Sequence, residues 1–432
     1  MCDLFWGQNL YQVLFSEYGG GITLDGWKEV RSQTDYIGLT VHYYLDWKLH
    51  ERSLLMTEYD REIKTGENIR EFVEANLKNP YGVTETLFHN ALFVTDGAST
   101  SKHGESFRQL SKASEAALDR FTCACHRINT SLSDIFLEKF VRLHHGEDAV
   151  TRLKPAYQLV KDCKELVVTR WGSHVAMLES VQDQFTAVEA ILKRRNEEDK
   201  LPGPDGMLND LIVLLKPFET ATEELSASRT PTLHLVVNVF KAVREHLEEY
   251  QSEYPSLIKL GELLLVNFKQ KCIVQPEHKI ACFLHPPFRK LRIFSTDAER
   301  TGILNLTRSL LPSRAKPAAE TTTAPVTVPA KRKKFNYSQN EDVVDTESVA
   351  DEVTRYHELV CRIPVGDAAE LWKENEKQFP GLAKLAKKYL ATPAGSVASE
   401  HKFNRGPRRC GFVDFSRCGA VAVNWLPVRF AE

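Results

Sequence analysis

Residues 19–45, GGGITLDGWKEVRSQTDYIGLTVHYYL, decide the fold class of this chain. A glycine turn leads into a short apolar strand, Ile22–Leu24, which ends at Asp25. After a polar stretch, Tyr36–Leu45 is rich in β-branched and aromatic residues, and such residues favour strands. The stretch therefore predicts two strands of a sheet, the first of which ends in a carboxylate.

The pattern of strands, now with a helix among them, continues up to about residue 128. Arg52–Tyr59 predicts a weaker third strand, and Thr65–Leu77 predicts a helix because its apolar residues recur at helical spacing. Leu92–Thr95 is a short apolar run typical of a buried strand, and Asp96 follows it directly. Phe121–Ile128 predicts a fifth strand. Strands and a helix in this order indicate a mixed α/β layer.

The pattern becomes helical beyond about residue 130. Apolar residues then recur in steps of three and four, which is the spacing of one helix face. Such faces run over 178–192, 208–218 and 236–247, so we expect a block of helices rather than more sheet. A further apolar face over 382–390 is followed by Pro393, which ends that helix.

Residues 312–345 differ from both of these parts. Pro, Ala and Thr dominate, and the basic run Lys331–Lys334 and an acidic run follow. A segment of this composition buries too little apolar surface to order itself, so we expect a flexible linker. The basic run is typical of a nuclear import signal or a phosphate-binding tether, and equally of a solvated charge run.

The bulk composition excludes several classes of protein. The formal net charge is −2, so contact with nucleic acid must come from local basic patches. The nine cysteines are an odd number spread through 432 residues, which favours a reducing compartment over a disulfide framework. Residues 1–14 do not resemble a signal peptide, and no apolar run approaches a membrane span. We expect a soluble intracellular protein of two or three domains, with no membrane partner.

Asp25 and Asp96 each follow a short apolar strand. If these strands are neighbours, both carboxylates lie at one edge of the sheet, where they can hold two divalent ions about 3.5–4 Å apart. Carboxylate oxygens suit Mg²⁺ or Mn²⁺. The alternative is that each acid is only a turn or helix-capping residue, which is common after a strand.

Seven stretches, in order along the chain, resemble the motifs of hAT-superfamily DNA transposases. They are Thr23–Trp27 with Tyr36–His42 (T-x-D-x-W and Y-x-x-x-T-x-H), Val94–Ser99 (V-T-D-x-A-x-N/S), Cys123–Asn129 (C-x-x-H-x-L-N), Thr169–Ser173 (an Arg-Trp pair with Ser), Leu225–Leu233 (L-S…P-T-L), Leu284–Arg289 (L-D-P-R-F-K) and Leu371–Glu400 (W…F-P-x-L-A-x-L-A…S-E). Each motif alone is weak, but seven in the right order are a specific signal.

The resemblance implies a fold class of α/β plus α, in which a ribonuclease-H-like catalytic core is interrupted by a large all-helical insertion. It divides the chain into the first part of the core (1–145), the helical insertion (146–311), the flexible linker (312–345), the C-terminal dimerisation region that completes the core (346–404) and a divergent tail (405–432).

The same resemblance supplies a third acid, Glu400, which in the sequence alone is an ordinary helix residue. Asp25, Asp96 and Glu400 would then form an Asp-Asp-Glu site that binds two Mg²⁺ or Mn²⁺ ions and catalyses DNA strand cleavage and transfer. The long interval from Asp96 to Glu400 fits an insertion that returns the chain to the same sheet edge.

Further positions of the resemblance imply contacts with DNA. Trp171, beside Arg170, matches a family Trp linked to a flipped base, because an aromatic ring can stack on the base while the cation meets phosphate. The alternative is a Trp that packs at the start of a helix. Cys123, Cys125 and His126 suggest zinc, but structural zinc normally needs four ligands and no second pair lies close by. We therefore expect buried strand residues and no structural zinc, with His126 as a candidate phosphate contact.

The C-terminal region resembles the part of the family that joins two protomers. The residues expected there are Trp372, Leu382, Leu385, Ala386, Tyr389 and Leu390. The same face is equally typical of core that packs on the catalytic domain, and both interpretations can hold together. The resemblance thus implies DNA and a second copy of the chain as partners, and the nucleus as the place of action.

Two departures from the family bear on activity. We expect no BED-type zinc finger before Asp25, because no Cys-x-x-Cys with a distal His pair precedes it. His401 and Asn404 replace the family's Arg and Ser, and residues 406–432 do not resemble its closing helix. Two functions therefore stay open: a metal-dependent transposase, or a degenerate or domesticated nuclear protein that acts by dimerisation and DNA binding.

Overall fold

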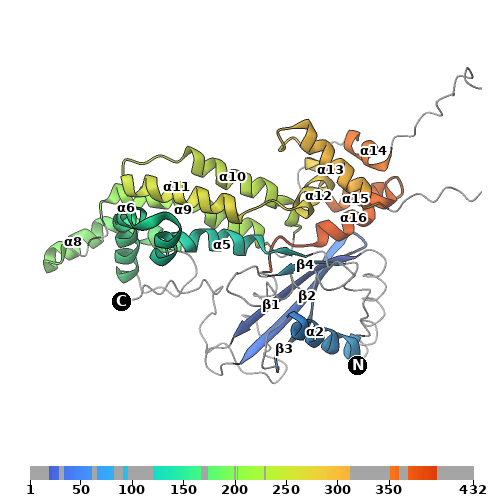
Figure 1. Cartoon of the computed structure of the whole chain (residues 1–432), viewed down its shortest axis with the longest axis horizontal. Helices are drawn as coiled ribbons and strands as arrows, with labels where there is room; N and C mark the ends of the chain where they lie inside the picture. The colour runs from blue at the N-terminus through green and yellow to red at the C-terminus, as the bar shows by residue number, and fades with distance from the viewer. Residues whose placement is uncertain are drawn as a thin grey trace, which may run out of the picture.

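The computed structural model describes residues 19–28, 34–60, 66–81, 91–95, 120–166, 174–198, 201, 203–227, 230–311, 351–359 and 368–396. Within these residues one sheet has the strand order β3-β2-β1-β4-β5 (Figure 1). The strands are β1 (Gly20–Lys28), β2 (Asp35–Leu45), β3 (Lys48–Glu58), β4 (Ala91–Thr95) and β5 (Arg120–Thr122). β1, β2 and β3 pair antiparallel, whereas β4 pairs parallel with both β1 and β5.

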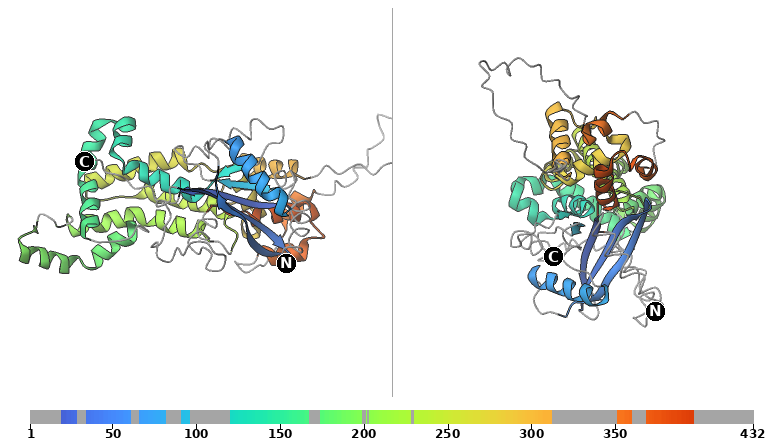
Figure 2. Two further views of the ribbon diagram at one scale, coloured as in Figure 1. Left: turned by 90° about the horizontal axis from the view of Figure 1, so that it is seen from below. Right: turned by 90° about the vertical axis from the view of Figure 1, so that its right-hand side faces the viewer.

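One face of the sheet is covered by α2 (Gly66–Tyr81), which lies beside the strands in Figure 2. Ile22 and Leu24 of β1 share an apolar cluster with Ile69 and Phe72 of α2. Because side chains alternate along a strand, this cluster uses every second residue of β1. The first four predicted strands and the first predicted helix are confirmed.

The opposite face of the sheet is covered by α16 (Pro380–Ala391), which packs on β1, β2 and β4. Leu92 and Val94 of β4 belong to the large core cluster on this side, whereas Ala91 and Phe93 belong to the cluster with α2. Figure 1 shows α16 between the sheet and the neighbouring helices. Those helices are α12 (Pro276–Leu284), η3 (Pro286–Phe288), α13 (Asp297–Ser309), α14 (Glu352–Glu358) and α15 (Ala368–Asn375).

The predicted helical block extends away from the sheet as an arm, with α8 at its far end (Figures 1 and 2). Its elements are α5 (Ala124–Ile135), α6 (Glu138–Leu166), α7 (His174–Asp183), α8 (Phe185–Arg195), α9 (Asp205–Leu225), η2 (Leu233–Leu235), α10 (Val236–Glu249) and α11 (Pro255–Lys271). α5 packs against α6, α9 and α11, which ties the arm to the end of β5. No helix in the described part of the chain is long and apolar enough to span a bilayer.

Three predictions of secondary structure were wrong. The first strand does not end at Asp25 but continues through it to Lys28, paired with β2. The fifth strand ends at Thr122, and most of the stretch expected to extend it to Ile128 belongs to α5. Cys123 interrupts the strand because its Sγ accepts a hydrogen bond from the backbone N–H of His126, which caps the first turn of that helix. The helix face expected over 178–192 is divided between α7 and α8 at Gln184, whose φ and ψ are −105° and 7°.

Candidate functional site

Asp25 lies within β1, one position beyond its last pairing with β4 and opposite Gly38 of β2. Its side chain is partly exposed, and its Oδ1 accepts a hydrogen bond from the backbone N–H of Gly26 at 2.9 Å. By strand alternation Asp25 shares a sheet face with Gly21 and Thr23, away from α2. The first predicted acid is therefore within reach of a ligand from solvent.

A buried polar network lies on the same face. Thr23 Oγ1 is 3.4 Å from the Thr40 carbonyl and 3.2 Å from His42 Nε2, and His42 Nδ1 is 3.9 Å from Glu51. Thr23, Thr40 and His42 are each at most 2% exposed. The sequence motifs contain all three residues, but we did not predict their contact. The sequence does indicate part of this contact. In T-x-D and T-x-H the two residues are two positions apart, so in a strand Thr23 lies on the same face as Asp25, and Thr40 on the same face as His42.

The neighbourhood of β1 and β4 is confirmed. Their parallel pairing runs up to Leu24 opposite Thr95. These two residues directly precede Asp25 and Asp96 in the sequence. Asp96 itself lies outside the described residues, so the meeting of the two carboxylates stays a prediction.

The chain after α16 crosses the face of β1 that carries Asp25. Thr392 packs so closely on Gly21 that a Cβ atom there would lie 2.7 Å from Thr392 Cα. Ala394 then donates its N–H to Thr232 Oγ1 at 2.8 Å, and its carbonyl accepts the N–H of Ala124 at 2.9 Å. These contacts hold the segment Thr392–Ser396 against the sheet and the start of the helical arm.

Cys123 joins this segment to β4. Its backbone N–H donates to the Thr95 carbonyl at 2.9 Å, and its Sγ accepts the N–H of Ser396 at 3.4 Å. The segment therefore runs from Gly21 to the level of Thr95, in the direction of β1. Glu400, four residues beyond Ser396, lies outside the described residues.

Cys123, Cys125 and His126, which were expected to be buried strand residues rather than zinc ligands, lie at the start of α5 and not in a strand. Cys123 Sγ accepts two backbone N–H groups, and Cys125 Sγ lies 3.5 Å from Ser226 Oγ and 3.9 Å from the Thr222 carbonyl. Among the described residues, which include neither Asp96 nor Glu400, no group of three or more His, Cys, Asp or Glu side chains could hold a metal ion.

The predicted DNA contacts fall only partly within the described residues. His126 lies in the first turn of α5 and is partly exposed. Arg170 and Trp171 lie outside the described residues. All three stay predictions.

The residues expected to join protomers lie largely in the core of the single chain. Five of them are at most 4% exposed: Trp372, Leu382, Ala386, Tyr389 and Leu390. Leu385 is partly exposed. The Trp372 Nε1–H donates to the Leu284 carbonyl at 3.0 Å, and its ring stacks on Tyr356 with 4.8 Å between centroids. The interpretation of this face as core is confirmed, and its contact with a second protomer stays a prediction.

Comparisons with known proteins give the context of this arrangement. Residues 352–410 match the hAT family C-terminal dimerisation region. The chain is similar to the Transposable element Hobo transposase of Drosophila melanogaster, with 25% identity over 444 residues, covering 88% of this chain and 65% of that protein. It is also similar to Zinc finger BED domain-containing protein 4 of Homo sapiens, with 21% identity over 364 residues, covering 74% of this chain and 29% of that protein.

The chain thus spans a little less than two thirds of the first relative and less than a third of the second. The similarity to the Hobo transposase nevertheless extends over most of this chain, and the family match lies where the C-terminal motifs predicted it. The ordered motifs, that match and that similarity agree in what this chain resembles: hAT transposases, with the hAT family C-terminal dimerisation region matched over residues 352–410.

Proposed function

We propose that this protein is a transposase-like enzyme that cleaves and transfers DNA strands with two divalent metal ions held by Asp25, Asp96 and Glu400. The observation that carries the proposal is the position of Cys123. This residue is bonded to the end of β4 and to Ser396, and β4 is paired with β1. Each of the three chain segments that lead to an acid therefore passes the same end of the sheet.

The reach of the chain supports this meeting. The last pair between β1 and β4 is Leu24 with Thr95, and the next residues along the chain are Asp25 and Asp96. Glu400 is four residues beyond Ser396, and four residues span at most about 14 Å when fully extended. The segment before it already lies on the face of β1 that carries Asp25. The same arrangement is what we propose as the ribonuclease-H-like core.

The donor set suits the proposed metal. Three carboxylates provide hard oxygen ligands, which Mg²⁺ and Mn²⁺ prefer. Asp25 is partly exposed, so an ion can reach it without disturbing the core. Two such ions would activate the attacking water or hydroxyl and stabilise the leaving oxygen. In this proposal His126, Arg170 and Trp171 contact the DNA substrate.

A second function is proposed because one observation favours it independently of the metal site. The hAT C-terminal dimerisation region is present over residues 352–410. Self-association and DNA binding in the nucleus need no catalytic acid, so a non-catalytic protein with these two properties is the competing proposal. Leu385, partly exposed on α16, would then belong to the contact between protomers.

Nicking of supercoiled plasmid DNA in Mg²⁺ or Mn²⁺ separates the two functions. We expect the unaltered chain to nick the plasmid, and Asp25→Ala, Asp96→Ala and Glu400→Ala each to reduce the rate at least about a hundredfold, since loss of a ligand's supporting contacts alone costs up to that much. The control is Asp60→Ala, which removes an exposed acid beyond the end of β3 and should leave the rate unchanged.

Two results would decide against catalysis. If the unaltered chain does not nick the plasmid in either metal, and sedimentation shows a dimer, the non-catalytic function is supported. If nicking persists equally in all three variants, Asp25, Asp96 and Glu400 are not the metal ligands.

A further inference from the structure

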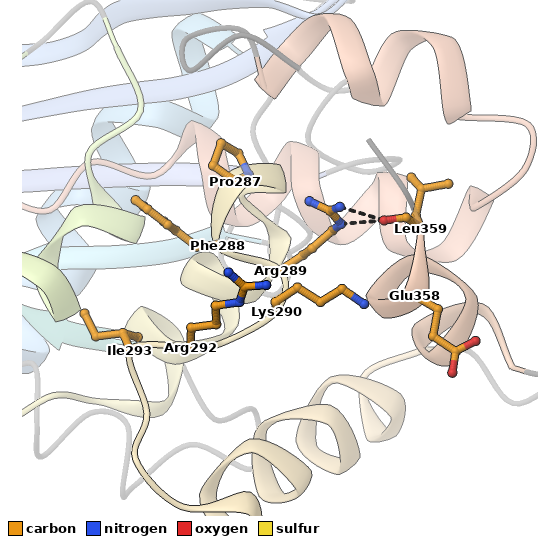
Figure 3. A pocket seen from close by; sticks show the side chains of 8 residues that line it. All are labelled: Pro287, Phe288, Arg289, Lys290, Arg292, Ile293, Glu358 and Leu359. Atoms are coloured by element: carbon orange, nitrogen blue, oxygen red, sulfur yellow. Dashed lines mark hydrogen bonds between the residues drawn. The ribbon is translucent and has the colours of Figure 1, made fainter. Parts of the chain in front are cut away.

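A pocket of about 420 Å³ opens between the turn that follows α12 and the end of α14 (Figure 3). None of the residues that line it belongs to the sheet. The residues that line it are Pro287, Phe288, Arg289, Lys290, Arg292, Ile293, Glu358 and Leu359. Three of its eight lining residues are cationic and lie within four consecutive positions, so the pocket concentrates positive charge in a chain of net charge −2.

Arg289 builds one wall of the pocket. Its Nε and Nη2 donate to the Leu359 carbonyl at 3.0 and 2.6 Å, and its Nη1 donates to the Pro286 carbonyl at 2.7 Å. Figure 3 shows the first two bonds as dashed lines. These contacts fasten the turn after α12 to the end of α14, so the guanidinium of Arg289 is engaged in the structure itself.

Lys290 and Arg292 are the two cationic side chains of the pocket that can bind a ligand. No ion pair joins either of them to an acid in the part of the chain that the structure describes, and Arg292 is exposed. Buried Leu291 lies between them with a φ of 51°, in the left-handed region that a leucine seldom adopts. This turn lets both neighbouring cations line one opening. Glu358 is the acid of the pocket, and Figure 3 shows its carboxylate turned away from Lys290 and Arg292.

The electrostatics of a nearby histidine agree with a positive potential here. Burial and the charge of Lys290 lower the pKa of His357, and Arg289 and Arg308 add to this effect, although Glu358 opposes it. The contributions of Lys290, Arg289 and Arg308 reflect positive charge around His357, whereas the contribution of burial disfavours charge of either sign.

We propose that this pocket binds a backbone phosphate of DNA through Lys290 and Arg292. An Arg fork and a Lys ammonium are the usual protein donors to phosphate oxygens. The inference rests on the proposed function only in taking DNA as the bound polymer.

Two observations favour a DNA phosphate over a small free anion. Arg292 is exposed at the mouth, where it can meet a long ligand that passes over the surface. The pocket is also joined to the segment before Glu400. The ring of Phe288, in the pocket wall, lies 5.8 Å from that of His234, and His234 is two residues from Thr232, which holds Ala394. DNA that contacts this pocket thus contacts an element which also supports the candidate site.

Fluorescence anisotropy with a labelled DNA duplex tests the proposal on the full chain. Chelator replaces divalent metal, and the parent is the Asp25→Ala variant, so binding is measured without any cleavage. We expect Lys290→Ala with Arg292→Ala to weaken binding about tenfold at low salt. The slope of log Kd against log salt should fall by about 1–2, as expected for the loss of one or two phosphate contacts.

Two controls make the result specific. Arg194→Ala with Arg195→Ala removes the same charge from exposed positions of α8 and should leave binding and slope close to those of the parent. Lys290→Arg with Arg292→Lys keeps both charges and should restore most of the binding. Equal thermal midpoints for all of these variants show that each is folded.

The proposal is overturned if the Lys290 and Arg292 variant binds the duplex as tightly as the α8 control. A second experiment uses inorganic phosphate in place of DNA. If phosphate raises the thermal midpoint of the parent, and this effect alone is lost in the Lys290 and Arg292 variant while duplex binding is unchanged, the pocket is a small-anion site and the proposal is wrong.

Discussion

Gly21 is the residue at which the C-terminal part of the chain comes closest to the sheet. A Cβ atom added there would lie 2.7 Å from Thr392 Cα and 2.9 Å from its Oγ1. The first of these neighbours is backbone, so it cannot turn aside as a flexible side chain would. Glycine is required at this strand position by close approach.

We therefore predict that Gly21→Ala displaces the segment Thr392–Ser396 and lowers the free energy of unfolding by about 1–3 kcal/mol, the usual cost of overpacking. Urea unfolding measures the loss. If the protein cleaves DNA, the cleavage rate should fall by more than the loss of folded protein explains, because the displaced segment leads to Glu400.

The matched control is Gly302→Ala in the middle of α13, where an added Cβ atom has no neighbour within 4 Å. Alanine favours the helix there, so we expect up to about 1 kcal/mol of added stability. Equal effects at the two glycines would contradict the close approach at Gly21.

At the scale of single residues, the sequence predicted Asp25 but not its surroundings. An acid that follows a short apolar run can be recognised from a few neighbouring residues, whereas the contact of Thr23 with His42 depends on the register of β1 and β2. The role of Cys123 was beyond local reasoning, because its sulfur meets Ser396, 273 positions away. Only the family resemblance indicated that the C-terminal region returns to the sheet.

The β2–β3 hairpin holds α15 and α16 in place through its turn. Trp47 donates its Nε1–H to Glu376 at 2.9 Å, and Lys387 of α16 donates to the other oxygen of Glu376 at 2.7 Å. The Lys387 ammonium also lies 5.0 Å from the centre of the Trp47 ring. Burial opposes ionisation of Glu376, but hydrogen bonds from Lys387 and Trp47 outweigh it, so the pKa of Glu376 is lowered overall.

We predict that Glu376→Gln destabilises the protein more than Lys387→Met does. The first change leaves an ammonium only 8% exposed without its counterion, whereas the second leaves a carboxylate that is 40% exposed. Because one partner reaches solvent, we expect about 1–3 kcal/mol for Glu376→Gln, below the range for a fully buried pair.

A double-mutant cycle in urea checks this coupling. The two changes together should cost less than the sum of the single changes, since the double variant contains neither an unpaired charge nor a lost partner. Strictly additive losses would show that Trp47, rather than the ion pair, holds α16 on the hairpin.

At the scale of elements, predictions succeeded where one periodicity covered the whole element. The first four strands and the helix that became α2 were such cases. The fifth strand failed because the apolar pattern was followed only as far as Ile128. Buried residues continue in steps of three and four through Cys125, Ile128, Leu132 and Ile135, which is the spacing of a helix.

The whole molecule is joined at a cluster of buried histidines. α12 packs on η2, α13 and α16, so the arm and the C-terminal helices meet there. His234 of η2 stacks on His285 with 3.7 Å between ring centres, and His278 lies fully buried in the first turn of α12. Burial lowers the pKa of His278 to about 3 and that of His285 to about 4, and it lowers the pKa of His234 well below its usual range.

These shifts predict that mild acid destabilises the whole fold. An unfolded histidine has a pKa of about 6.5, so below that pH the unfolded chain binds protons that the folded chain excludes. Stability is therefore full above pH 6.5 and falls as the pH drops towards 4. At pH 5 His278 and His285 should each cost about 2 kcal/mol relative to pH 8.

Urea unfolding at pH 8 and pH 5 measures this loss, and His278→Gln with His285→Gln tests its source. The double variant has lost both titrating groups, so its difference in unfolding free energy between the two pH values should shrink by about 4 kcal/mol. The prediction is contradicted if the parent is as stable at pH 5 as at pH 8. The buried histidines would then be protonated in the folded protein, and the junction between the arm and the C-terminal helices would be less tightly packed than the structure indicates.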